Sequence, residues 1–268
     1  MYFLKRKLLK GNEKGKMIIK KIKIWLFVSI FISFFLVLTS NPGLAYPTLQ
    51  LDILDGTYDY QTQTIIAPSE SFTLYAFLIP DRWNSLTDDY YISAALVPKL
   101  TPPGGDLGTF TFNNYTINVT TDMVYGVPPL ENIVSLQGWD PRDLPRHGIY
   151  PTYFYEFGFQ FDNRNQISRY NTQERAQSGG QIPPTTGNEI MYYMAFSVDT
   201  SQLNPNYVVH FDLYNTKLIQ RTGDIDVSQF APFSHDAQSV QVPEPSTLLL
   251  LGSGLMGAWL FGRRKFKN

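Results

Sequence analysis

The sequence predicts an all-β fold, a single antiparallel β-sandwich or jelly-roll-like domain at residues 46–241, with one apolar helix before it and another after it. Three observations predict this fold. Apolar and polar residues alternate repeatedly through the middle of the chain, these stretches are rich in β-branched and aromatic residues, and prolines and glycines separate them. Helical periodicity with capping residues is hard to find in the same region.

Each strand is predicted from its local pattern. The three rings of Phe157–Phe161 alternate with smaller residues and therefore share one face. Asn113 and Asn114 predict a tight hairpin, because asparagine tolerates left-handed backbone geometry. Pro128–Tyr150 and Asn163–Asn188 are predicted to be long loops. The predicted strands are Thr48–Leu54, Phe72–Ile79, Tyr90–Val97, Thr109–Phe112, Tyr115–Val119, Phe157–Phe161, Met191–Val198 and Tyr207–Leu213.

The net charge of −1 conceals a strongly acidic middle region. Tyr46–Gln241 contains 9 basic and 21 acidic residues, a formal charge of −12, whereas the basic residues are concentrated at the two ends of the chain. Such a domain repels nucleic acid, which excludes a nucleic-acid partner, and suits a soluble extracytoplasmic domain. The chain has no cysteine, which excludes disulfides and thiol catalysis.

The N-terminus has the pattern of a secretory signal peptide. A basic stretch precedes the uncharged run Ile24–Leu38, and small residues follow up to Ala45. We expect residues 1–45 to direct export by the secretion translocase and signal peptidase to cut between Ala45 and Tyr46. Met17 is an alternative start. An uncleaved anchor helix is the competing interpretation, although the apolar run is short for a membrane span of roughly 20 residues.

The C-terminus combines three features in a fixed order. Val242, Pro243, Glu244 and Pro245 come first, an uncharged run follows at residues 247–262, and a basic cluster ends the chain. The run predicts a transmembrane helix of about 24 Å. The basic cluster, which includes Arg263 and Arg264, should stay cytoplasmic and so place residues 46–241 outside.

This tripartite tail, residues 242–268, resembles the PEP-CTERM sorting signal of bacterial envelope proteins. The resemblance implies recognition by exosortase, with Glu244 between its two prolines as the recognised residue. It also implies a bacterium that makes exopolysaccharide, export through the inner membrane, transient anchoring by the C-terminal helix, and a final place on the envelope surface or in the extracellular matrix. A permanent tail anchor is the alternative.

Several sequence segments of the middle region are similar to those of the exported family called choice-of-anchor N, whose members carry alternative anchors on a shared domain. That resemblance implies a surface role and no established catalytic residues. These segments are Leu49–Tyr58, Leu74–Pro80, Gly148–Phe161, His210–Lys217 and Ala231–Ala237.

No residue pattern predicts catalysis. His235 and Asp236 are adjacent, and neighbours on an extended chain point to opposite faces, so a structural contact is the favoured interpretation. His147 stands in a loop rich in proline and glycine, without a nucleophile motif to accompany it. His210 is expected to be a hydrogen-bonded residue of a strand. We therefore expect a non-enzymatic protein.

Calcium is the only cofactor that the pattern suggests. Asp52, Asp55 and Asp59 cluster near the start of the domain, and Asp224 and Asp226 share one face of an extended stretch. Grouped carboxylate oxygens suit calcium, although their spacing does not match an EF-hand loop. Ordinary turn aspartates are the alternative.

Trp83 and Trp139 are the candidate glycan contacts. Both are predicted to lie in loops near carboxylates, an arrangement that suits stacking against sugars. The favoured function is a non-catalytic surface or matrix component that associates with exopolysaccharide. The alternatives are a glycan-active hydrolase with an unidentified carboxylate pair and a calcium-stabilised adhesive or carbohydrate-binding module.

Overall fold

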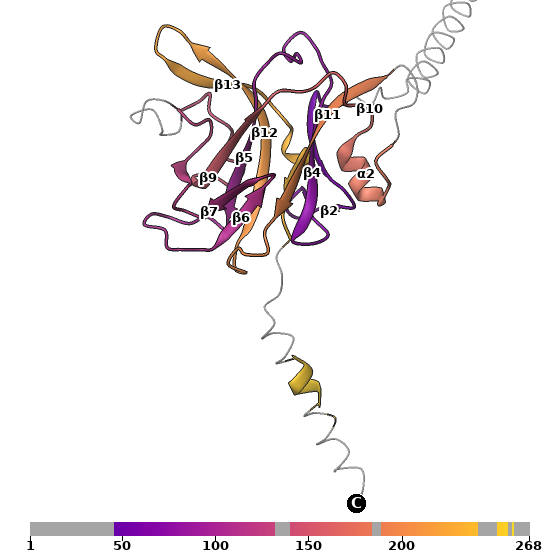
Figure 1. Ribbon diagram of the computed structural model, residues 1–268, viewed down its shortest axis with the longest axis vertical. Helices are drawn as coiled ribbons and strands as arrows, with labels where there is room; N and C mark the ends of the chain where they lie inside the picture. Colours follow the sequence, from indigo (N-terminus) through magenta and orange to yellow (C-terminus); the bar gives the residue numbers. More distant parts are fainter. Residues whose placement is uncertain (1–45, 132–139, 184–188, 241–250, 257–258, 260–268) are drawn as a thin grey trace, which may run out of the picture. The chain divides into compact units, whose positions relative to one another are not determined.

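The computed structural model describes residues 46–131, 140–183, 189–240, 251–256 and 259. The chain separates into two compact units, Met1–Ala45 and Tyr46–Asn268, and the description below concerns the second. Its strands form two sheets with mainly antiparallel pairing, which confirms the predicted all-β sandwich (Figure 1).

The first sheet has six strands, all paired antiparallel. Strand β10 pairs with β11 beside the main path. The order along the path is β1 (Leu49–Ile53), β4 (Ser71–Leu78), β11 (Ile190–Asp199), β6 (Thr109–Phe112) and β7 (Tyr115–Asn118), and β10 spans Gln166–Ser168.

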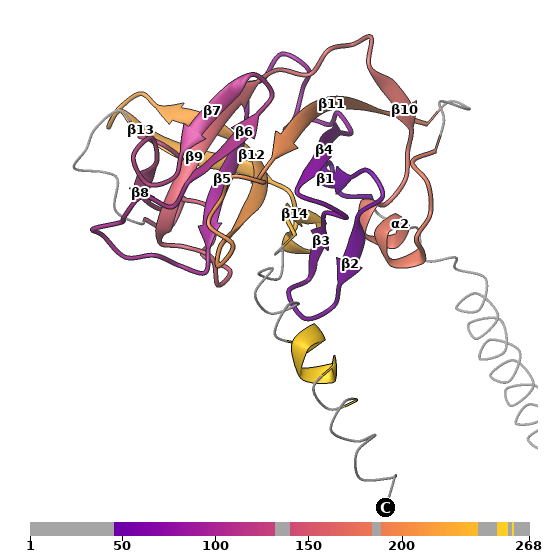
Figure 2. The ribbon, with the colours of Figure 1, turned by 60° about the horizontal axis from the view of Figure 1, so that its bottom comes forward.

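The second sheet has eight strands, and its long strand β12 pairs with β5, β13 and β14. Strand β14 also pairs with β3, in the parallel direction (Figure 2). The order is β2 (Thr57–Asp59), β3 (Thr64–Ile66), β14 (Asp236–Gln238), β12 (Val208–Ile219), β5 (Tyr90–Val97), β9 (Thr152–Phe159) and β8 (Val124–Gly126), and β13 (Asp224–Phe230) pairs with β12 beside this path.

Alternation along the strands builds the main core between the two sheets. In β12, Val209, Phe211 and Leu213 are fully buried in this core, opposite residues such as Leu74 of β4. Burying large apolar side chains of this kind stabilises a fold by about 1.5–3 kcal/mol each. The neighbouring residues of β12 therefore point to the outer face of the second sheet.

A long segment covers that outer face. Val127, Leu144 and Tyr150 pack there on a second apolar cluster that includes Phe154 of β9 and Tyr214 of β12. We call residues 127–131 and 140–151 the cover segment. It corresponds to the predicted loop Pro128–Tyr150, and it turns the outer face of β12 into a buried environment.

The sequence pattern located β1, β4, β5, β6, β7 and β11, but it placed β9 too late, at Phe157–Phe161, and ended β12 six residues early, at Leu213. It missed β10, β13 and a helix. The hairpin at Asn113, whose φ is 52°, joins β6 to β7 as predicted. Helix α2 (Thr172–Ser178) lies within the predicted loop Asn163–Asn188, capped by Asn171 at its start and by Gly179 at its end. A short 3₁₀ helix, η2 (Phe233–His235), precedes β14. Short helices lack the length from which periodicity can be read.

Candidate functional site

The outer face of β12 positions two chemically active side chains under the cover segment. His210 and Asp212 alternate with the core residues of this strand, so both point away from the main core. Their side chains are only 2% and 3% exposed. A histidine and an aspartate two residues apart on one strand therefore share a buried, polar location.

Two other segments complete this group. His147 comes from the cover segment, where its backbone has a φ of 27°, and Asp236 begins β14. The His147 ring stacks on Phe233 of η2, with ring centroids 4.1 Å apart. The side chains of His147 and Asp236 are 8% and 1% exposed. We call His147, His210, Asp212 and Asp236 the His/Asp cluster.

The four side chains direct one atom each to a common point. The Nε2 atom of His147 lies 3.3 Å from Nε2 of His210, 3.1 Å from Oδ1 of Asp212 and 3.6 Å from Oδ2 of Asp236. The Nε2 atom of His210 lies 3.6 Å from the same oxygen of each aspartate. All four atoms lie within 4.8 Å of one another, as the ligands of a single ion would.

Hydrogen bonds orient part of the cluster from behind. Nδ1 of His147 lies 2.6 Å from the carbonyl oxygen of Pro145, so Nδ1–H donates and leaves Nε2 facing the cluster. The hydroxyl groups of Tyr150 and Ser93 donate to Oδ2 of Asp212, at 2.7 Å and 3.3 Å. Oδ1 of Asp212 is thereby free to face the two imidazoles.

Other atoms of the cluster are buried without a hydrogen-bond partner. Both carboxylate oxygens of Asp236 and Nδ1 of His210 are in this condition. A buried carboxylate without a hydrogen bond is costly, because here the lost hydration is offset only by the two imidazoles, whose Nε2 atoms lie 3.6 Å from Oδ2 of Asp236. Each such group in a folded domain calls for an explanation.

Burial and mutual charge shift the pKa values of the cluster strongly. Burial and the neighbouring Asp212 raise the pKa of Asp236 to about 7, whereas the two imidazoles hold the pKa of Asp212, despite its burial, well below its usual range. Burial opposes charge on His210, but the carboxylates raise its pKa to about 10, and they also raise the pKa of His147.

Sequence reasoning treated His147, His210 and His235 one by one and missed the cluster. Only His210 and Asp212 carried a local signal, since residues two apart on a strand share a face. His235 lies elsewhere, with Nε2 3.1 Å from Oδ1 of Asn171, and burial lowers its pKa to about 4. His235 and its neighbour Asp236 thus have different partners, although His235 ends the 3₁₀ helix η2 and does not lie on the extended chain that the prediction assumed.

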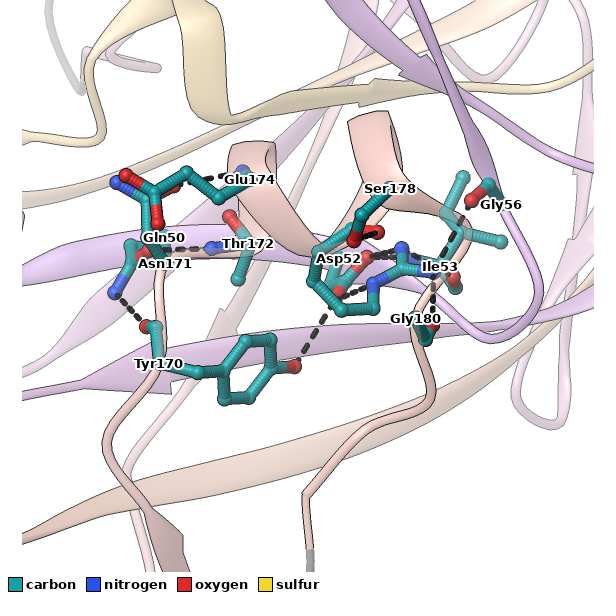
Figure 3. Close-up of polar contacts among 11 residues, drawn as sticks. Gln50, Asp52, Ile53, Gly56, Tyr170, Asn171, Thr172, Glu174, Ser178 and Gly180 are labelled. Atoms are coloured by element: carbon teal, nitrogen blue, oxygen red, sulfur yellow. Dashed lines mark hydrogen bonds and ion pairs between the residues drawn. The ribbon is translucent and has the colours of Figure 1, made fainter.

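Asp52 lies in a buried ion pair rather than beside other carboxylates. Its Oδ2 atom accepts hydrogen bonds of 2.9 Å from Nε of Arg175 and from the hydroxyl of Tyr170, and its Oδ1 atom pairs with Nη2 of Arg175 (Figure 3). Asp55 is exposed at the end of β1, and Asp59 accepts two local turn hydrogen bonds. Among the described residues, two groups of side chains could hold a metal ion, and neither group includes Asp52, Asp55 or Asp59.

Asp224 and Asp226 do lie among other carboxylates. Carboxylate oxygens of Glu131, Asp140 and Asp224 lie within 4.8 Å of one another. Nη1 of Arg142 donates to Oδ2 of Asp226, 2.8 Å away. One oxygen each of Glu131, Asp224 and Asp226 is buried without a hydrogen-bond partner. We call these four acidic residues together with Asp143 the acidic group.

The predicted glycan contacts are described only in part. Trp83 is 57% exposed, and the guanidinium group of Arg82 lies 4.9 Å from the centre of its ring. Trp139 lies outside the described residues. A pocket of about 200 Å³ lies on the outer face of the first sheet, a feature that sequence reasoning did not predict. Its lining is Tyr75, Phe77, Gln166, Ile167, Ile182, Pro183 and Tyr193.

The match to a known protein family lies in the C-terminal tail of the chain. Residues 241–265 match the PEP-CTERM protein-sorting motif. The PEP-CTERM match supports an exported protein that is processed by exosortase and transiently anchored at its C-terminus. No curated protein and no solved structure matches the chain.

The PEP-CTERM motif itself lies largely outside the described residues. This holds for Val242, Pro243, Glu244, Pro245, Arg263 and Arg264, and Ala45 of the predicted signal cleavage site is also outside them. Residues 251–256 are helical and exposed. In the part of the chain that the structure describes, no helix combines the length and the apolar character needed to cross a membrane.

Proposed function

We propose that the sandwich is a non-catalytic domain displayed on the cell envelope or in the extracellular matrix, where it associates with exopolysaccharide. The observation that carries this proposal is the position of the PEP-CTERM motif. The motif begins at residue 241, just after β14, the last strand among the described residues, ends at Gln238. The sorting signal is therefore joined directly to the sandwich, which is the part of the chain that it would deliver.

Two features support a non-catalytic role. The His/Asp cluster is sealed by the cover segment, with side chains at most 8% exposed, so a substrate would not reach its imidazoles. The aromatic pocket has no carboxylate among its lining residues, whereas glycoside hydrolysis uses a pair of carboxylates about 5–9.5 Å apart. The hydrolase alternative has less support than a binding role.

The pocket supports the association with polysaccharide. Tyr75 and Phe77 stack with ring centroids 5.9 Å apart and planes at 11°, and the ring of Tyr193 lies 5.9 Å from that of Tyr75. Aromatic faces next to a polar group such as Gln166 suit the apolar faces and hydroxyl groups of sugars. Trp83 and Trp139 stay predicted contacts outside this pocket.

A sorting experiment tests the display. We expect the full-length chain, expressed in a bacterium that contains exosortase, to reach the envelope surface or matrix, and a chain truncated after Gln241 to be released into the medium. Glu244→Ala should disturb sorting in the same direction, whereas Glu189→Ala, at an exposed glutamate of the sandwich, should not. Identical locations for the full-length and truncated chains would contradict the proposal.

A binding experiment tests the polysaccharide association. We expect the protein to bind the exopolysaccharide of its host in pull-down assays, and Tyr193→Ala to weaken binding about tenfold through the loss of one stacked ring. Tyr115→Ala is the matched control, because this tyrosine is 66% exposed and does not line the pocket. Trp83→Ala measures the contribution of the other predicted contact. If the wild-type protein binds no polysaccharide, the proposed association is wrong and only the display on the envelope or in the matrix stays proposed.

A calcium-stabilised module is the second candidate, and the acidic group favours it. Buried oxygens of Glu131, Asp224 and Asp226 have no partner, and calcium takes six to eight oxygen ligands of this kind. Calcium should then raise the melting temperature of the protein, and Asp224→Asn should reduce that rise. Equal melting temperatures with calcium and with a chelator would exclude this module.

A further inference from the structure

We propose that His147, His210, Asp212 and Asp236 form a structural site for one divalent transition-metal ion, with the donor set and geometry that zinc prefers. The site would join three segments of the domain: the cover segment, β12 and β14. This inference is independent of the proposed display and polysaccharide binding.

The distances within the cluster fit tetrahedral coordination. Bonds of about 2.1 Å from zinc to nitrogen and oxygen imply edges of about 3.4 Å between ligands in a regular tetrahedron. Five of the six edges are 3.1, 3.3, 3.6, 3.6 and 3.6 Å, and the sixth, between Asp212 and Asp236, is at most 4.8 Å. A square-planar site would require two diagonals of about 4 Å for bonds of about 2 Å, and five similar edges exclude that arrangement.

Without a metal ion, neither of two simple protonation states of the two imidazoles gives all four facing atoms a favourable contact. Two imidazolium groups would place their Nε2–H groups 3.3 Å apart and repel each other, whereas neutral His147 would aim a lone pair at the Asp212 oxygen 3.1 Å away. Neither arrangement gives Asp236 a hydrogen bond, since its oxygens have no partner within hydrogen-bonding geometry. One cation at the common point would satisfy all four facing atoms together.

The charge balance also favours a divalent ion. Two carboxylates and two neutral imidazoles carry a charge of −2, so a divalent cation makes the buried assembly neutral and removes the cost of isolated buried charge. Imidazole nitrogen is a common ligand of zinc, copper and nickel, whereas calcium and magnesium take oxygen ligands. The nitrogen donors thus distinguish this site from the acidic group.

The surroundings of the cluster have the features of a structural metal site. The carbonyl of Pro145 fixes the tautomer of His147, and Tyr150 with Ser93 holds Asp212 in place. Metal-binding imidazoles and carboxylates usually have such partners behind them. Four protein ligands and almost complete burial leave no open position for a substrate, which is the mark of a structural rather than a catalytic zinc site.

The chain has a physical reason to use such a site. An exported domain is often cross-linked by disulfides, and this chain has no cysteine. Strand β14 has only three residues and leads into the sorting motif. A bond from Asp236 to an ion that is also held by β12 and the cover segment would fasten this last strand.

Metal analysis of the full-length protein, purified in mild detergent, tests the proposal. We expect about one zinc per chain after incubation with zinc and gel filtration, and cobalt substitution should give the strong visible absorption of tetrahedral cobalt. His147→Gln should lose both, while its circular dichroism spectrum stays that of a folded β protein, because His147 lies outside the core. His235→Gln should retain both and is the matched control.

Several results would overturn the proposal. These are a folded wild-type protein without stoichiometric zinc, a His147→Gln protein that retains as much zinc as His235→Gln, and tight binding of calcium but not zinc. If His147→Gln does not fold, X-ray absorption of the zinc-loaded wild type decides. Four nitrogen or oxygen neighbours at about 2.0 Å with two imidazoles support the site, and any other ligand set overturns it.

Discussion

Tyr150 connects the cover segment to the His/Asp cluster through a single hydroxyl group. The ring is fully buried, and its hydroxyl donates to Oδ2 of Asp212 at 2.7 Å. Partners of this kind fix the orientation of a metal-binding carboxylate, and their loss typically reduces metal affinity about 10–100-fold. The role of Tyr150 is therefore to position Asp212, not to bind the ion.

Tyr150→Phe should weaken zinc binding at least about tenfold, measured by competition with a chromophoric chelator. Tyr90→Phe is the control, because Tyr90 is also a fully buried tyrosine, at the start of β5, and its hydroxyl donates to the carbonyl oxygen of Ser85 at 2.8 Å. Tyr150→Phe loses the hydrogen bonds of the hydroxyl to Asp212 and Ser93, whereas Tyr90→Phe loses one, and of the two tyrosines only Tyr150 contacts the cluster. Equal zinc affinity in the two variants would show that Tyr150 has no positioning role.

The individual residues of the cluster show where prediction from sequence ends. The pattern of β12 placed His210 and Asp212 on one face, because that relation depends only on the strand's two-residue period. His147 and Asp236 join them through tertiary structure, from a loop and from a separate strand. The local periodicity of the sequence does not predict that His147 and Asp236 lie beside His210 and Asp212. The sequence could therefore indicate half of the candidate site.

At the level of elements, helix α2 depends on a buried ion pair. A helix of seven residues is too short to be stable alone. Arg175 holds it by hydrogen bonds from Nε to Asp52, from Nη1 to the carbonyl oxygen of Gly56 and from Nη2 to that of Ile53. Gln50 adds a second attachment, since the N–H group of Thr172 donates to its Oε1 atom (Figure 3).

Asp52→Asn should lower the free energy of unfolding by about 3–5 kcal/mol, because Arg175 would keep a buried charge without its counter-ion. Urea unfolding measures the change. Asp162→Asn is the control, since Asp162 pairs with Arg164 on the surface, where an ion pair contributes at most about 1 kcal/mol. Similar losses in the two variants would mean that the buried pair does not hold α2.

The acidic group gives the second sheet a pH dependence in calcium-free protein. Burial and the neighbouring carboxylates raise the pKa values of Glu131 and Asp143 to about 7. The folded state thus binds these protons more tightly than the unfolded state. Their stabilising effect is complete below about pH 4 and is lost as the pH rises to about 7.

Asp143→Asn should reduce this loss. We expect its melting temperature to exceed that of the wild type at pH 8 by about 4 °C and to approach it at pH 5, because the substitution removes one repelling charge. Asp122→Asn, at an exposed turn, controls for the loss of a negative charge in general. If Asp143→Asn and the wild type differ equally at the two pH values, repulsion in the acidic group is not the cause.

For the whole molecule, local patterns determined the fold class but not the arrangement of strands. Strands β5 and β6 coincide with their predicted ranges. Strand β6 alternates between buried and half-buried residues, whereas β5 is buried along most of its length and was recognised by its aromatic and β-branched content. The parallel pair of β3 and β14 joins residues far apart in the chain, and three-residue strands carry little pattern. The sheet order and the sites that it creates therefore required the structure.

The whole molecule should depend on its metal. An ion that joins the cover segment, β12 and β14 acts only on the folded state, and a ligand at about 1,000 times its dissociation constant adds about 4 kcal/mol of stability. For a domain of this size, each kcal/mol changes the melting temperature by roughly 2–4 °C. We expect removal of zinc by a selective chelator to lower the melting temperature by about 10 °C. Adding zinc back should restore the melting temperature of the wild type and of His235→Gln but not that of His147→Gln. A wild-type melting temperature that does not depend on zinc would contradict a stabilising ion.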